Sequence, residues 1–91
     1  MVKIYIPKND EIKNLIVKEV SGKEEFNYIC NKNEYDFLRE ISQEEFDSLG
    51  VQSKEHEIGN VLVYETGATY ILDGLGYFKI NFEELEKKEW R

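Results

Sequence analysis

The sequence has one cysteine and one histidine, so it has few of the side chains that form disulfides and zinc sites. It also has only one proline and one tryptophan. Because Cys30 has no second cysteine to pair with, no disulfide can form within the chain, which suits a reducing compartment. Cys30 stands at an apolar position in FNYICN, as expected of a buried and unreactive thiol. Cys30 and His56 together cannot supply the four ligands of a structural zinc site. We therefore expect no bound metal.

Long apolar runs are missing as well. No stretch approaches the roughly 18 apolar residues that span a bilayer. The first ten residues, MVKIYIPKND, lack the apolar core and cleavage site of a secretory signal. The abundance of Lys, Glu, Ile and Asn is typical of AT-rich bacterial or phage genomes. The expected location is therefore the cytoplasm of a bacterial cell or of an infected bacterial host.

No motif of a known reaction or cofactor is present. Ser53 precedes His56 by three residues, but nothing around it resembles a nucleophile elbow. The spacing of Gly67, Gly74 and Gly76 fits neither a Walker loop nor a dinucleotide-binding loop. The run 55–57, Glu-His-Glu, reads as a solvated loop rather than a set of metal ligands. We predict that the protein is not an enzyme and needs no cofactor.

The composition is that of one small folded domain. The 91 residues are 41% hydrophobic and 13% aromatic, which is too apolar for a disordered segment and enough for one modest core. We predict a single α+β domain over residues 1–91. It should contain an antiparallel sheet of about five to six strands with two to three helices packed on it.

Local patterns predict the elements of this domain. Residues 2–6 read as a strand ended by Pro7. Residues 9–20 have the apolar spacing of a helix, capped by Asn9 or Asp10 and stopped by Gly22, although LIVKEV alone would also form a strand. Residues 25–41 alternate like a β-hairpin that turns at Asn31–Glu34.

Further along, Ser42 and Glu45 form a capping box that predicts a short helix over 43–49, ended by Gly50. Residues 51–59 read as a polar loop. NVLVYET, GATYILD and GYFKIN predict an antiparallel meander with turns at 66–67 and 73–76. The last stretch, NFEELEKKEWR, opens with Asn81 as a helix-capping signal.

The charge is unevenly distributed along the chain. The net charge is −7, and residues 34–73 contain ten acids against two bases, Arg39 and Lys54. Residues 1–33 and 74–91 are close to neutral. A concentrated negative charge repels nucleic acid and anionic membranes and attracts basic protein surfaces. Acidity that serves only solubility is the alternative.

From this charge we predict a small protein-binding inhibitor or modulator that blocks a basic surface of a partner protein, and the partner we expect is a nucleic-acid-binding protein or complex. It would contact neither nucleic acid nor membrane directly. The predicted contact residues are Glu34, Tyr35, Asp36, Glu40, Glu44, Asp47, Glu55, Glu57, Tyr64 and Glu65. In size, composition and acidity the chain is similar to phage anti-defence proteins, including anti-CRISPR proteins, and to immunity proteins that neutralise nuclease toxins. No motif ties it to a named family.

Two alternatives use other features of the sequence. Six tyrosines fall in or beside the predicted strands, so a small-ligand or nucleotide-sequestering protein could use them together with the turns near Gly67 and Gly74. A homo-oligomeric structural module, such as a homodimer, would instead pair exposed edge strands across its interface.

Overall fold

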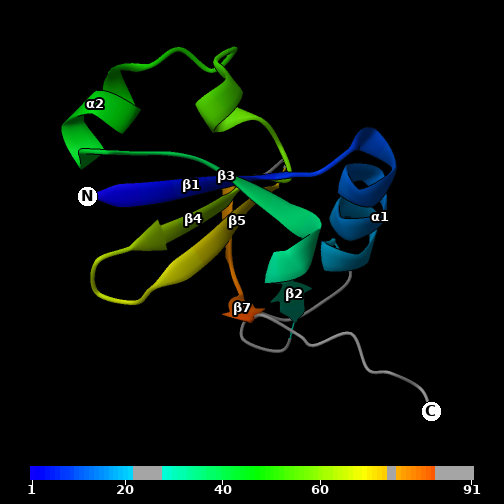
Figure 1. The fold of residues 1–91 in the computed structure, drawn as a ribbon. Coiled ribbons are helices and arrows are strands. Elements are labelled where there is room, and N and C mark those ends of the chain that lie inside the picture. Colours follow the sequence, from blue (N-terminus) through cyan, green and yellow to red (C-terminus); the bar gives the residue numbers. More distant parts are fainter. Residues whose placement is uncertain (22–27, 74–75, 84–91) are drawn as a thin grey trace.

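The computed structural model describes residues 1–21, 28–73 and 76–83, and it has an α+β fold (Figure 1). Five strands form an antiparallel sheet in the order β3-β1-β4-β5-β6, and two more form a separate parallel pair, β2-β7. The strands are β1 (Val2–Pro7), β2 (Ile29–Asn31), β3 (Tyr35–Ile41), β4 (Val61–Tyr64), β5 (Thr69–Asp73), β6 (Gly76–Lys79) and β7 (Asn81–Glu83). The helices are α1 (Asp10–Val20) and α2 (Gln43–Ser48), with short 3-10 turns at Lys32–Glu34 and Lys54–His56.

The helical interpretation of residues 9–20 is confirmed. Asn9 caps α1, because its Oδ1 accepts a hydrogen bond of 2.8 Å from the Ile12 amide. Ile16 and Val20 are buried on the side that packs against the sheet. The predicted stop at Gly22 lies outside the described residues.

The predicted hairpin over 25–41 is wrong. β2 pairs in parallel with β7, where Cys30 lies opposite Phe82, and β3 pairs antiparallel with β1. Between them, the 3-10 turn at Lys32–Glu34 is held by the Asn31 side chain, which accepts from the Asn33 amide. A helical turn at this position sends the two strands into different sheets instead of folding one back on the other.

The predicted helix start at Asn81 is also wrong, because Asn81–Glu83 form β7. Pairing with β2 overrides the local capping signal. The remainder of that predicted helix, residues 84–91, lies outside the described residues. The meander of β4, β5 and β6 is confirmed, with Gly67 at a φ of 94° in its first turn. At that φ a residue with a side chain would be strained.

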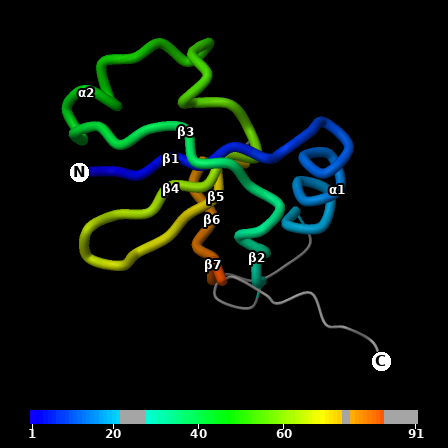
Figure 2. Tube along the Cα trace, viewed as in Figure 1, coloured from blue at the N-terminus to red at the C-terminus, as the bar shows by residue number. Residues whose placement is uncertain are grey.

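The large sheet buries apolar residues on both faces, because successive side chains of a strand point to opposite sides. One face, covered by α1 and the β2-β7 pair, holds the cluster Ile16, Val20, Cys30, Tyr35, Val61, Ile71 and Ile80. The other face, here called the α2 face, holds Val2, Ile4, Ile41, Phe46, Leu62 and Leu72. In the Cα trace α1 and α2 lie toward opposite ends of the sheet (Figure 2). Neither helix of the described chain is long and apolar enough to cross a membrane.

Candidate functional site

The strand register gathers five of the ten predicted contact residues at one end of the sheet. Val2, at the start of β1, lies opposite Ile41 of β3 and Tyr64 of β4. The end of β3, the start of β1 and the end of β4 are therefore adjacent, and α2 follows β3 directly (Figure 1). We call this group the acidic end: Glu40, Glu44, Asp47, Tyr64 and Glu65.

The other five predicted residues lie elsewhere. Glu34 and Asp36 are at the opposite end of β3, where Asp36 forms an ion pair of 3.5 Å with Lys8. Tyr35 is buried, and its hydroxyl donates to the Gly59 carbonyl at 3.2 Å. Glu57 is exposed and Glu55 is buried, both in the segment that connects α2 to β4. The carboxylates of residues 34–73 are thus divided among regions and do not form one continuous face.

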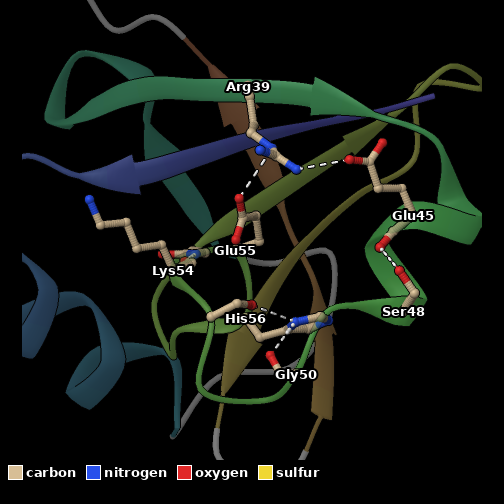
Figure 3. A network of polar contacts seen from close by, with 9 residues as sticks. Arg39, Glu45, Ser48, Gly50, Lys54, Glu55 and His56 are labelled. Atoms are coloured by element: carbon tan, nitrogen blue, oxygen red, sulfur yellow. Dashed lines mark hydrogen bonds and ion pairs between the residues drawn. The ribbon is translucent and has the colours of Figure 1, made fainter.

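Arg39 accounts for two of the carboxylates in this segment (Figure 3). Its Nη2 lies 3.1 Å from Glu45 Oε2, and its Nε lies 3.1 Å from Glu55 Oε2. The Nε contact is an ion pair by distance, although its N–H is not aligned for a hydrogen bond. Glu55 is only 9% exposed, so the expectation of a fully solvated loop is wrong at this residue. A carboxylate this buried needs a cationic partner. Arg39 provides it, and the ion pair attaches the 3-10 turn at residues 54–56 to β3 of the sheet.

α2 is held firmly at the acidic end. The Ser42 hydroxyl accepts from the Glu45 amide at 3.0 Å, which confirms the predicted cap. Phe46 is fully buried, and its ring lies 4.1 Å from the His56 ring between centroids. The opposite side of the helix exposes Glu44 and Asp47. Neither forms an ion pair with a described residue, and Asp47 accepts a hydrogen bond of 2.8 Å from Gln43.

Three tyrosines cross the α2 face beside this helix. Tyr70 lies opposite Leu62, and Tyr77 lies opposite Leu72, so Tyr64, Tyr70 and Tyr77 form a diagonal line over β4, β5 and β6. Adjacent ring centroids are 5.7 and 5.9 Å apart. We call these residues the tyrosine row. Their hydroxyls have no hydrogen-bond partner among residues 1–21, 28–73 and 76–83, and Tyr77 is 48% exposed.

The negative charge of Asp47 acts on two members of this row. Burial raises the pKa of Tyr64 and of Tyr77, and the negative charge of Asp47 adds to both shifts. Sequence reasoning selected Tyr64 but missed Tyr70 and Tyr77. The alternation of side chains along the predicted meander, combined with its turn lengths, could have placed all three rings on one face.

A shallow hollow on the sheet end offers little to a nucleotide. It measures about 250 Å³ and is lined by Met1, Lys3, Glu40, Val63, Tyr64 and Glu65. Ligand pockets commonly enclose about 300–1,000 Å³. Its two carboxylates are balanced by two positive groups: Lys3 lies opposite Glu40 in the strand register, and the Met1 amino group lies 3.3 Å from Glu65. The hollow therefore has no excess of positive charge to hold a phosphate group. This geometry gives the nucleotide-sequestering alternative no specific support.

The nucleophilic side chains are engaged in structural contacts. Burial raises the pKa of Cys30 to about 12, so its thiol is protonated at neutral pH. Ser53 Oγ lies 3.0 Å from His56 Nδ1, but that nitrogen also lies 3.2 Å from the Gly50 carbonyl oxygen, and the ring packs on Phe46. These contacts close the turn at 50–56. Across the described ranges, no three His, Cys, Asp or Glu side chains are arranged to hold a metal ion.

Comparison of the chain with protein-family models, with curated proteins and with solved structures found no match. The function is therefore argued from the acidic end and the tyrosine row alone.

Proposed function

We propose that the protein is a binding module that docks its acidic end on a basic surface of another protein and thereby inhibits or modulates that protein. The observation that carries this proposal is the placement of Glu44 and Asp47. Both carboxylates are exposed on α2 without an ion-pair partner in the described part of the chain, and Tyr64 packs against the same apolar cluster as Phe46 of this helix. Opposite charge steers association, and aromatic side chains commonly anchor protein interfaces.

The rigidity of α2 supports the same proposal. The helix is capped by Ser42, anchored through buried Phe46 and linked by Glu45 to Arg39. Side chains presented on a fixed helix lose less conformational entropy on binding than those of a mobile loop. The carboxylates of the acidic end can therefore hold one arrangement before they meet a partner.

The partner we propose is a protein with a basic surface that normally holds nucleic acid. Carboxylates at fixed positions would occupy the places of phosphates, so that docking excludes the nucleic acid. Such a protein would act in the bacterial cytoplasm, in the manner of a phage anti-defence or anti-CRISPR inhibitor or of a nuclease immunity protein. It would need no catalysis, no cofactor and no direct contact with nucleic acid or membrane.

A capture experiment with matched charge reversals tests the proposal. The tagged protein is incubated with bacterial lysate at low and high salt, and each captured protein is identified and then purified for binding kinetics. Glu44→Lys with Asp47→Lys alters the acidic end. Asp36→Lys with Glu57→Lys makes the same change in net charge away from it.

We expect the wild type and the control pair to retain the same basic protein at low salt and to release it at high salt. The acidic-end pair should associate at least about tenfold more slowly, because electrostatic steering raises association rates by about 10- to 1,000-fold. Equal association rates for the acidic-end pair and the wild type would show that this surface is not the contact.

A further inference from the structure

The tyrosine row already holds one cation within the molecule. Lys79 lies opposite Tyr70 in the β5-β6 register, and its Nζ is 5.7 Å from the Tyr70 ring centroid. This distance lies within the range of about 6 Å over which a cation is attracted to the face of an aromatic ring. The contact of Lys79 with Tyr70, the middle ring, shows that a positive charge can lie against the tyrosine row.

The two outer rings combine three features that suit a second cation. Within the described chain, no cation lies over Tyr64 or Tyr77. Neither hydroxyl forms a hydrogen bond with a described residue. Tyr64 packs against the apolar cluster that contains Phe46, the residue before Asp47, and the negative charge of Asp47 adds to the raised pKa of both phenols. A ring face, a phenol oxygen and a carboxylate are thus presented together on one surface.

We propose that the tyrosine row and Asp47 recognise arginine side chains of the basic partner in preference to lysine. This inference rests on the proposed function and names the chemistry of the same contact. A planar guanidinium can stack on a tyrosine ring while its several N–H groups donate to Asp47 and to a phenol oxygen. A lysine ammonium is a compact and strongly hydrated charge that lacks the flat surface for stacking.

The charge around the row argues against a nucleobase as its occupant. Aromatic rings on a sheet can stack bases, but that mode needs positive charge to hold the phosphate backbone. Here Glu44 and Asp47 are exposed on the helix that packs on the same face of the sheet, and Lys79 is the one described cation placed over the row. The ligand that fits this surface is therefore a planar cation such as a guanidinium group.

Two labelled peptides of equal charge provide the test. One is nine residues of alternating glycine and arginine, and the other replaces each arginine with lysine. Their affinities for the full chain are measured by fluorescence anisotropy at about 50 mM salt, where surface charges are weakly screened. We expect the arginine peptide to bind about three- to tenfold more tightly to the wild type.

Single substitutions test whether the preference for arginine over lysine depends on the tyrosine row. Tyr77→Leu removes an exposed ring and should bring the affinity ratio close to one, whereas Tyr77→Phe keeps the ring and should keep most of the preference. Phe37→Leu is the control, because Phe37 is 54% exposed and packs against Tyr5, whose side chain belongs to the other face of the sheet. The control should keep the wild-type ratio, and circular dichroism checks that each variant is folded.

The outcomes separate this inference from the proposed function. Equal affinity of the two peptides for the wild type would overturn the arginine preference and leave an anionic docking surface in place. Failure of both peptides to bind would count against the docking surface itself. An unchanged preference in folded Tyr77→Leu, or a preference lost in Phe37→Leu, would place the contact away from the tyrosine row.

Discussion

At the scale of single residues, Arg39 connects three consecutive elements of the chain. It lies on β3, pairs with Glu45 of α2 and pairs with Glu55 of the 3-10 turn at Lys54–His56. Glu55 is the buried member of this group, with a side chain 12% exposed. Loss of the guanidinium would leave that carboxylate without an ion-pair partner among the described residues.

We predict that Arg39→Leu lowers the free energy of unfolding by about 1–3 kcal/mol, since a buried carboxylate that loses its partner keeps its desolvation penalty. Lys8→Leu is the control, because it breaks the solvent-exposed pair with Asp36, and such pairs contribute about 0–1 kcal/mol. Urea denaturation followed by circular dichroism measures both. Similar losses in the two variants would mean that Glu55 does not depend on Arg39.

Cys30 predicts how stability changes at alkaline pH. Burial raises its pKa from 9.0 to about 12, and burial also raises the pKa of Tyr35, which lies in the same buried cluster. The unfolded chain releases the thiol proton first, so this group favours the folded state fully below pH 9. That contribution is lost between about pH 9 and 12, with a slope of at most about 1.4 kcal/mol per pH unit from this group.

The measurement is a series of urea denaturations from pH 8 to 11. Cys30→Ala should be less stable at pH 8 because it leaves a cavity, and its stability should fall less steeply with pH than that of the wild type. Parallel curves for the two proteins would exclude the thiol as a source of the pH dependence.

At the scale of elements, the start of α2 is determined by a local cap, whereas its place on the sheet is determined by tertiary packing of Phe46. Ser42 and Ser48 both form hydrogen bonds to the helix backbone, but Ser42 accepts from an amide that the helix itself leaves unpaired, whereas Ser48 donates to the Glu45 carbonyl. Ser42→Ala should therefore lower the free energy of unfolding by about 1 kcal/mol, and Ser48→Ala by a few tenths. Thermal denaturation compares them, and equal shifts in Tm would contradict the capping role.

The same distinction explains which elements the sequence could predict. Asn9, Ser42 and Gly67 act on their own neighbours, so α1, α2 and the first meander turn could be foreseen. The pairing of β2 with β7 joins residues about fifty positions apart, and alternation within each segment contains no information about that partner. The signals for a hairpin at 25–41 and for a cap at Asn81 were sound locally and were overridden by this pairing.

Some features of the candidate site also follow from local sequence, and others depend on the tertiary fold. Exposure of Glu44 and Asp47 follows from their three-residue spacing opposite buried Phe46. The position of Glu65 at the same end of the sheet requires β1 to lie between β3 and β4, which no local pattern encodes. The burial of Glu55 likewise depends on Arg39, sixteen positions earlier in the chain.

At the scale of the whole molecule, the outer edge of β3 has no partner strand within the described residues. Its exposed positions include Asp36 and Glu40, and the register with β1 shifts between Ile4 and Tyr5. Charges and register irregularities are common protections of edge strands against pairing with another chain. β6 is the other outer strand of this sheet, so the homo-oligomeric alternative could form its interface at either edge.

We therefore expect sedimentation equilibrium at micromolar concentration to give the monomer mass of 10.8 kDa. A mass about twice as large would favour the homodimer. Asp36→Lys and Glu40→Lys would then test whether the dimer forms at β3, since each changes a charge on that edge strand.

The parallel pair of β2 and β7 sets an order of events during synthesis. β2 leaves the ribosome about fifty residues before β7, so its backbone amides and carbonyls stay unpaired with β7 while β1, β3 and β4 can already pair with one another. During that interval Cys30 lacks Phe82 opposite it. A thiol-reactive reagent applied to stalled nascent chains should therefore modify Cys30 when the chain stops before β7 and should spare it once β7 has emerged and paired.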